Sequence, residues 1–185
     1  MALLTRRLVV CGLIVILGAA FPARLCAEEG SSSREYALKA AFLFNFLRFI
    51  EWPGEALRTP TVCVVAATEA AGTVERALAG KQVDGRDVKV RALPSFDTEG
   101  CAMVFVPDAS LPAWPRIREG LGCRPILAVG EGGGFLAAGG SISLVAEANR
   151  MRFDVNRAAA ACTGLRFSSR LLSLARAVDG RRAER

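Results

Sequence analysis

Tyr36 to Pro53 of the 185-residue chain reads YALKAAFLFNFLRFIEWP, and the rest of the fold is organised around this stretch. Four of the ten Phe residues fall within it. Ser32 and Glu35 form a capping box that predicts a helix start, and the proline after Trp52 predicts the helix end. Because its polar residues do not line one face, the helix should be covered on nearly all sides. We expect a core helix; the alternative is a helix that also presents aromatic side chains to a partner.

The first 27 residues have the order of a secretory signal peptide. Arg6 and Arg7 supply a positive region, residues 8–20 an apolar region, and residues 21–27 a cleavage region. We therefore expect export to the periplasm, with a domain over residues 28–180 and a charged, frayed tail over residues 181–185. The leader holds three arginines and no acidic residue, so its removal lowers the formal charge from +6 to +3. The remaining charge is scattered, which argues against a nucleic-acid partner.

After the first helix, short apolar runs typical of buried strands alternate with helical segments. The expected strands are residues 61–67, 87–93, 101–106 and 125–129, and the expected helices are residues 68–80 and 111–121. Residues 141–145 and 150–156 predict an antiparallel hairpin. The predicted fold class is an α/β single-domain sandwich. It has a mostly parallel central sheet, an antiparallel edge hairpin, and helices on both faces.

Two further segments have distinctive local patterns. Gly130–Gly140 (GEGGGFLAAGG) lacks the Lys and Ser/Thr of a phosphate-binding loop, so it is predicted to be a mobile connector. Asn156 predicts the start of a helix that Gly164 ends. Ser168 or Ser169 then opens a last helix, which carries Leu171, Leu172, Ala175 and Val178 on one side and is followed by the tail.

The chain contains no His, which excludes Ser-His and Cys-His nucleophile pairs. The carboxylates Glu131, Glu147 and Asp154 remain, and a hydrolase relying on carboxylates is the weakest of the alternatives. Four cysteines follow the leader without a CxxC pair, so we expect disulfides rather than a metal site: Cys63, Cys101, Cys123 and Cys162. The chain is therefore predicted not to be an enzyme and to need no cofactor or metal.

Two blocks, YxxKAAFLxNFxxFxEWP and RFDVNxxAAxxxGLxxSSxLLxLA, resemble the signatures of the YfiR-type periplasmic regulators. The matched positions of the first block are Tyr36, Lys39, Phe42, Asn45, Phe46, Phe49, Trp52 and Pro53. Those of the second block are Phe153, Asn156, Gly164, Leu165, Ser168, Ser169, Leu171 and Leu172. One departure is Asp108-Ala109-Ser110, which stands where the family has a Ser-Glu pair.

The resemblance implies a regulator that represses an inner-membrane diguanylate cyclase, the source of cyclic-di-GMP, by binding its periplasmic sensory domain. It also implies that a lipoprotein of the outer envelope can capture the repressor. Cys63 and Cys101 match a disulfide of the family, whereas Cys123 and Cys162 match none and stay a possible second pair.

For the partner-binding surface we predict the end of the first helix: Phe46, Arg48, Phe49, Glu51 and Trp52. The excess of aromatic residues also predicts a homodimer. The alternative function is a periplasmic small-molecule receptor with an apolar pocket lined by aromatics such as Phe42, Phe49 and Trp52.

Overall fold

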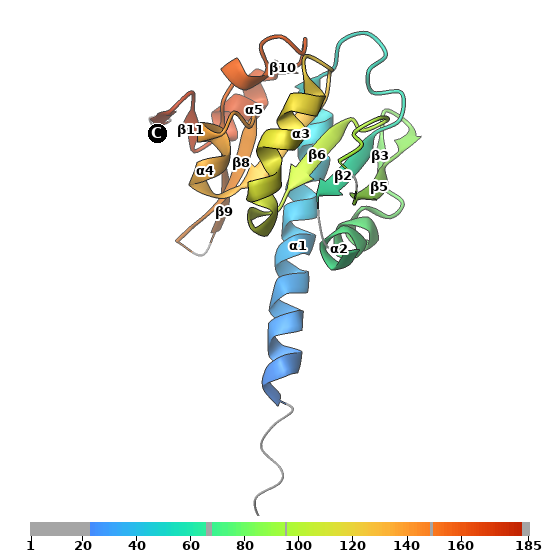
Figure 1. Ribbon diagram of the computed structural model, residues 1–185, viewed down its shortest axis with the longest axis vertical. Helices are drawn as coiled ribbons and strands as arrows, with labels where there is room; N and C mark the ends of the chain where they lie inside the picture. The colour runs from blue at the N-terminus through green and yellow to red at the C-terminus, as the bar shows by residue number, and fades with distance from the viewer. Residues whose placement is uncertain (1–22, 66–67, 95, 149, 183–185) are drawn as a thin grey trace, which may run out of the picture. The chain divides into compact units, whose positions relative to one another are not determined.

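The computed structural model describes residues 23–182 except residues 66–67, 95 and 149 (Figure 1). Most of the predicted signal peptide, residues 1–22, lies outside the described residues, as do residues 183–185 of the predicted tail. The chain divides into two compact units, residues 1–34 and 35–185. The described part of the first unit is the beginning of helix α1 (Ala23–Phe49).

The second unit alternates strands with helices along most of its length. Besides α1, the helices are α2 (Thr68–Leu78), α3 (Trp114–Leu121), α4 (Gly132–Ala137) and α5 (Ser169–Leu174), with the 3-10 helices η1 (Asp108–Ala113) and η2 (Ala158–Ala160). The strands are β1 (Ile50–Glu51), β2 (Thr61–Val65), β3 (Gln82–Val83), β4 (Arg86–Asp87), β5 (Lys89–Leu93), β6 (Met103–Val106), β7 (Leu127–Glu131), β8 (Ile142–Glu147), β9 (Arg150–Val155), β10 (Arg166–Phe167), β11 (Ala177–Val178) and β12 (Arg181–Arg182).

The central sheet has eight strands in the order β12-β11-β9-β8-β7-β6-β2-β5. The five strands from β8 to β5 are parallel to one another, and β8 and β9 form an antiparallel hairpin in which Ile142 faces Val155. Beyond the hairpin, the short strands β11 and β12 extend the sheet. The predicted mostly parallel sheet with its antiparallel hairpin is confirmed.

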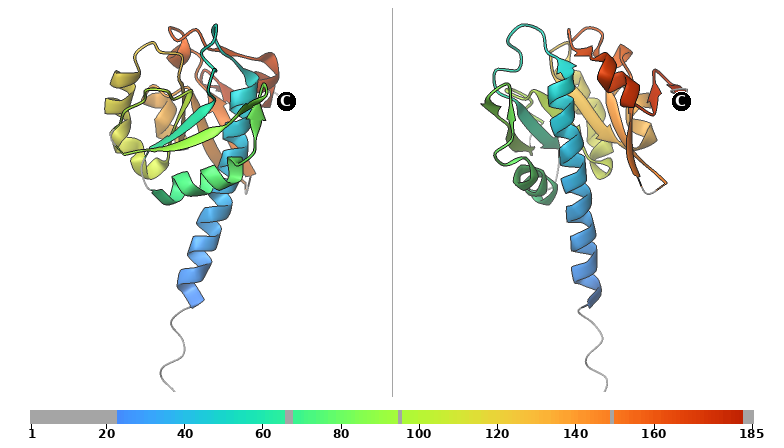
Figure 2. Two further views of the ribbon diagram at one scale, coloured as in Figure 1. Left: turned by 90° about the vertical axis from the view of Figure 1, so that its right-hand side faces the viewer. Right: turned by 180° about the vertical axis from the view of Figure 1, so that it is seen from behind.

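Helices cover both faces of this sheet (Figures 1 and 2). Residues 35–49 of α1, with α2 and α5, lie on one face, and α3 and α4 lie on the other. Strand β2 shows why both faces need cover: Val62 and Val64 belong to the first core, and Cys63 and Val65 to the second. A parallel strand that is apolar on both sides must be buried on both sides.

The predicted start of the first helix is wrong. Helix α1 begins at Ala23, so Ser32 and Glu35 lie inside it and do not cap it. Gly30 and the three serines after it are weak helix formers, so residue propensity does not explain why the helix runs through them. The helix ends at Phe49, and the next two residues pair with β10 as strand β1.

The predicted connector at Gly130–Gly140 is also wrong: it contains the end of β7 and helix α4. The side chain of Phe135 is 0% exposed and packs on Trp114, with ring centroids 4.8 Å apart. A Cβ added to Gly130 or Gly140 would lie only 2.4 Å or 2.1 Å from the Phe135 ring. These two glycines therefore make room for a core phenylalanine.

The C-terminal region differs from its prediction in length and order. Ser168 caps α5, its Oγ accepting from the Leu171 N–H at 3.2 Å, as predicted. The helix ends at Leu174, however, and Ala177–Val178 forms strand β11 beside β9. The helix expected after Asn156 is reduced to the three residues of η2. The tail is not frayed over its described residues, 181–182, because they form β12 and pair with β11. Just before it, Arg157 binds Asp179.

Candidate functional site

The two sequence blocks that resemble the family lie far apart in the sequence, near the two ends of the second unit. In the folded chain they are in contact. Phe153 of β9 packs edge-on against Phe46 of α1, with ring centroids 5.2 Å apart. Phe42, one turn earlier, lies 6.2 Å from both rings. Edge-to-face pairs of this kind stabilise beyond the area they bury, by about 0.5–1.5 kcal/mol each. The aromatic residues of the first block are thus partners of the second block.

The end of α1 is joined to the C-terminal block by backbone contacts as well. Ile50 pairs with Phe167 and Glu51 with Arg166 in the β1–β10 ladder. The Ser168 N–H donates to the carbonyl of Phe49 at 3.3 Å. These bonds fix the relative position of the side chains that the two blocks present to solvent.

We call one solvent-facing group the arginine–phenylalanine surface; it comprises Phe44, Arg48, Phe49, Arg166 and Arg170. The guanidinium carbons of Arg48 and Arg170 lie 5.9 Å and 5.3 Å from the Phe49 ring centroid. Arg48 also lies 5.7 Å from the Phe44 ring. Arg166 approaches the exposed Glu51 at 3.9 Å. Among the described residues, no carboxylate lies within ion-pair distance of Arg48 or Arg170.

The five predicted partner-binding residues differ in their exposure to solvent. Arg48 and Glu51 are exposed, and Phe49 and Trp52 are half-buried. The Trp52 indole N–H donates to the carbonyl of Leu47 at 3.1 Å, which fixes its ring. Phe46 is 1% exposed and belongs to the core, so it supports this surface from below and offers a partner nothing to touch.

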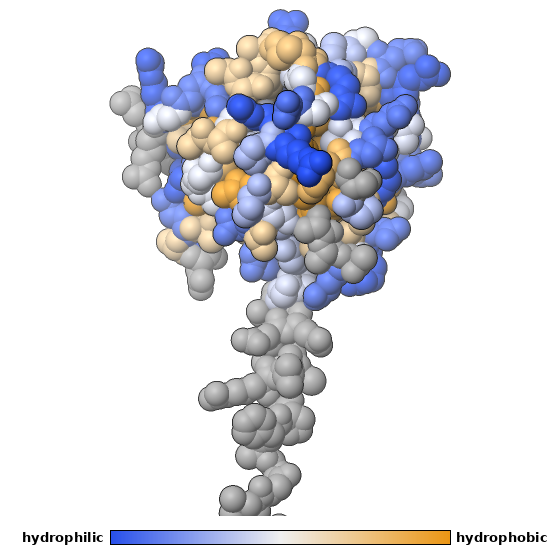
Figure 3. Space-filling view, viewed as in Figure 1, coloured by the Kyte–Doolittle hydropathy of each residue, from blue (hydrophilic) through white to orange (hydrophobic). Residues whose placement is uncertain are grey.

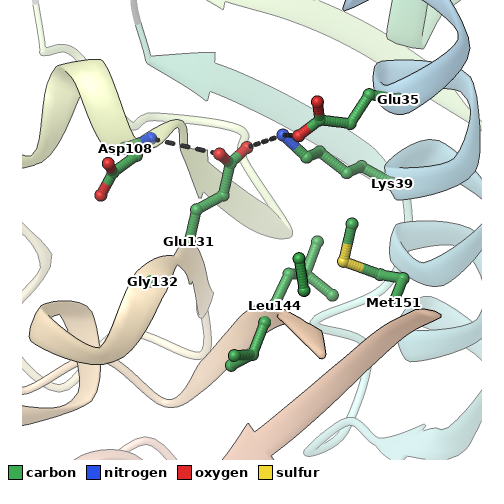
Figure 4. Close-up of a pocket in the computed structure, with 9 residues that line it drawn as sticks. Glu35, Lys39, Asp108, Glu131, Gly132, Leu144 and Met151 are labelled. Carbon is green, nitrogen blue, oxygen red and sulfur yellow. Dashed lines mark hydrogen bonds and ion pairs between the residues drawn. The ribbon is translucent and has the colours of Figure 1, made fainter. Parts of the chain in front are cut away.

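A second cluster lies at the carboxyl ends of β6 and β7, where open α/β sheets commonly bind ligands (Figure 4). Lys39 of α1 is only 3% exposed, and its Nζ lies 2.6 Å from Glu35 and 2.9 Å from Glu131. The backbone N–H of Asp108 donates to the other Glu131 oxygen at 3.4 Å. These groups line a hollow of about 290 Å³ together with Gly132, Leu144, Val145, Ala146 and Met151.

Burial disfavours the charged form of Lys39, but hydrogen bonds and charge attraction from Glu35 and Glu131 outweigh it, so its pKa lies above the ordinary value. The Lys39 ammonium also lies 4.6 Å from the centroid of the Tyr36 ring. Burial and the Glu131 carboxylate raise the pKa of Tyr36. At neutral pH the cluster therefore holds a charged lysine between two carboxylates. This arrangement anchors α1 to the edge of the sheet.

The sequence does not predict this contact, because Lys39 stands there only as a motif position and Glu131 falls in the predicted connector. The available signal is a lysine in a helix that is otherwise nearly all apolar, because a buried ammonium needs a carboxylate partner.

Of the three aromatic residues predicted to line a ligand pocket, only Phe42 lines the hollow described next. A hollow of about 550 Å³ is lined by Phe42, Met151, Arg152, Phe153, Ser173 and Leu174. The Leu174 side chain, 56% exposed, stands at this hollow. Phe49 and Trp52 do not line it, since they lie further along at the β1–β10 end of α1.

Both cysteine pairs are joined. Cys63 bonds to Cys101 and Cys123 to Cys162, with Cα–Cα distances of 5.8 Å and 5.2 Å. Within the described ranges, no group of three or more Asp, Glu or Cys side chains is placed to hold a metal ion. In the same part of the chain, no helix is both long enough and apolar enough to cross a membrane.

Comparison with known proteins covers most of the second unit. The model of the YfiR/HmsC-like family matches residues 36–176. No curated protein matches the chain. Among solved structures, eight chains match. One is the ABC domain in complex with L-Trp from Streptococcus pneumonia, with a TM-score of 0.55 and 15% identity over 75% of this chain.

The likeness to that structure shows a common fold alone, and the match spans 60% of the length of that chain. The family match is of a different kind, because it covers more than half of the sequence and both of its motifs. The chain belongs to the YfiR/HmsC-like family, whose members are periplasmic regulators of cyclic-di-GMP signalling and not enzymes.

Proposed function

We propose that the chain represses an inner-membrane diguanylate cyclase by direct contact with the periplasmic domain of that enzyme. The observation that carries this proposal is the surface at the end of α1. There Arg48, Phe49, Glu51 and Trp52 stand on a rigid base made by both family motifs. Arginine and large aromatic residues dominate the energetics of protein interfaces, because they bury much area per ordered side chain.

The test is reconstitution of repression. The cyclase is expressed in cells with and without this chain, cyclic-di-GMP is measured, and the full-length enzyme is solubilised in detergent for binding to the purified chain. We expect higher cyclic-di-GMP without the chain and a stable complex with it. An unchanged cyclic-di-GMP level together with no complex would exclude the proposal.

Two further partners are part of the proposal. An outer-envelope lipoprotein that captures the chain would release the cyclase, because it would compete for the repressor. A homodimer would present two copies of the surface to the cyclase. Sedimentation at tens of micromolar that shows monomer alone would remove the homodimer.

A second candidate function is a periplasmic small-molecule receptor, which the hollow beside Phe42 favours. The hollow is lined by Phe42, Met151 and Phe153 and by the guanidinium of Arg152. Its volume of about 550 Å³ is large enough for a small ligand. The two functions are compatible, since a ligand that prefers one conformation can bias partner binding. Thermal-shift screening against envelope metabolites, with Phe42→Ala as the variant that loses the shift, distinguishes this candidate.

A further inference from the structure

We propose that the surface of the partner that docks on the arginine–phenylalanine surface is acidic, and that its carboxylates pair with Arg48 and Arg170. This inference rests on the proposed function and adds the chemistry of the partner and the role of the C-terminal block. It assigns Arg170, which lies on α5 and far from α1 in sequence, to the same interface as Arg48.

The first step is the state of the two guanidinium groups. Arg48 and Arg170 approach one ring, Phe49, from two different elements, and both are exposed. Neither has a carboxylate partner within the described part of the chain. An aromatic ring attracts a guanidinium without using its N–H groups, so the donors of both arginines stay available.

The second step is the sum of charge at this place. Among the described residues, Glu51 is the one carboxylate within ion-pair distance of Arg48, Arg166 or Arg170, which leaves an excess of positive charge at this place. Arginine presents a planar fork that fits a carboxylate with two parallel hydrogen bonds. The β1–β10 ladder and the cap of α5 fix the backbone beneath the two arginines, and both guanidinium groups already lie near the Phe49 ring, so binding requires less ordering.

A lipid surface is the competing occupant, since phosphate headgroups also attract arginine. Membrane-surface helices insert large apolar side chains beside their basic residues. The exposed large apolar side chains of the described residues are Leu38 and Leu174, and neither belongs to this surface. Phe49 is half-buried beneath two guanidiniums. The observations therefore favour a protein with carboxylates over a membrane.

Figure 3 shows the opposite side of the sheet, where hydrophilic side chains surround small apolar groups. Helix α3 on that side supplies a matched control. Arg116 is exposed and lies 5.7 Å from the ring of Phe96, so it repeats the arginine–phenylalanine contact at a distant place. Charge reversal of Arg116 changes the net charge by the same amount as Arg48→Glu or Arg170→Glu alone, and it removes a ring contact of the same kind without touching the proposed interface.

The experiment measures the dissociation constant between the purified oxidised chain and the detergent-solubilised, full-length cyclase at low and high salt. We expect Arg48→Glu with Arg170→Glu to weaken binding by more than about tenfold, and Arg116→Glu to change it less than about twofold. High salt should weaken the wild-type complex and leave the double variant nearly unaffected. A Glu→Arg or Asp→Arg exchange on the cyclase should restore binding to the double variant.

The outcomes separate this inference from the proposed function. If the wild-type chain binds the cyclase and the double variant binds equally well, the acidic partner surface is excluded while the repressor function stands. If the wild-type chain does not bind, the repressor function itself fails. Binding to phosphatidylglycerol vesicles that requires both arginines, without binding to the cyclase, would assign the surface to the membrane and overturn the inference. Should charge reversal lower the melting temperature, Arg48→Gln with Arg170→Gln replaces it.

Discussion

Gly164 packs directly on Pro53: a Cβ added to Gly164 would lie 3.2 Å from Cγ of Pro53. Gly164 has a φ of +76°, a backbone conformation that side chains other than glycine rarely adopt. A turn in the middle of the second family block thus closes on the turn that ends the first. The tight contact and the left-handed backbone both favour glycine here.

The first prediction concerns this contact. Gly164→Ala should lower the free energy of unfolding by about 1–2 kcal/mol from the left-handed backbone, with a further loss from contact with Pro53. Gly54→Ala is the matched control, because Gly54 has a φ of +52° and open space around it. Urea unfolding of the oxidised proteins measures both losses. Equal losses in the two variants would show that Pro53 yields at no cost.

The second prediction concerns Asp179 and acid. The backbone N–H and the Nε–H of Arg157 donate to the two oxygens of Asp179 at 2.8 Å and 2.7 Å. Burial raises the pKa of the Asp179 carboxyl, but the hydrogen bonds and charge of Arg157 outweigh burial and leave the pKa below its usual value. The stabilisation is therefore present at neutral pH and lost as pH falls through the folded-state pKa.

Asp179→Asn should accordingly lower the free energy of unfolding at pH 7. It should also lose less stability than wild type as the pH falls below about 4. Asp84→Asn is the control, since Asp84 is also exposed and has a similar φ, 50° against 48° for Asp179. Denaturant unfolding across this pH range gives both profiles. Parallel profiles for wild type and Asp179→Asn would show that the Arg157–Asp179 ion pair does not cause the loss of stability in acid.

The third prediction is the order in which the disulfides open. Cys63 and Cys101 are 0% and 7% exposed, whereas Cys123 and Cys162 are exposed. Exchange needs a thiolate to reach a sulfur atom, so dithiothreitol should open Cys123–Cys162 first. Each bond closes a loop of similar length, with separations of 38 and 39 residues, and should add roughly 3–4 kcal/mol of stability. Alkylation and peptide mapping during a reductant titration give the order, and earlier opening of Cys63–Cys101 would contradict it.

The parts of the fold that the sequence predicts well are those with local causes. The apolar strand at Thr61–Val65, the cap at Ser168 and the β8–β9 hairpin follow from residue type and spacing alone. The order of strands in the sheet does not follow from spacing. It decides that Glu131, at the end of β7, comes close to Lys39 of α1.

The sequence predicts poorly those segments that have a weak local preference, because contacts made by the whole fold decide their conformation. Gly132–Ala137 has little tendency to form a helix, and burial of Phe135 between Gly130 and Gly140 holds it in place. Ala177–Val178 continues an apolar helical pattern but forms β11, because Arg176 is bound by Asp154 of β9. The sequence predicts one part of the candidate surface, Arg48 and Phe49 near the end of α1. Arg170 cannot be assigned to it from the sequence, because only the fold brings α5 to the Phe49 ring.

The last prediction tests the buried lysine. Lys39→Met should lower the free energy of unfolding by about 3–5 kcal/mol, because it leaves the Glu131 carboxylate buried without its cation. Glu35→Gln should cost less than about 1 kcal/mol, since Glu35 is more than half exposed.

The double variant Lys39→Met with Glu131→Leu should recover much of the loss, because it removes both charges together. Urea unfolding of Lys39→Met, of Glu131→Leu and of the double variant gives the coupling energy between the two side chains. The raised pKa of Lys39 adds a second readout. Its share of stability is complete below the unfolded-state pKa and is lost as pH rises through the folded-state pKa, so wild type should lose more stability than the double variant above about pH 10. Additive single losses and identical alkaline profiles would mean that Lys39 fills space beside Glu131 without pairing with it.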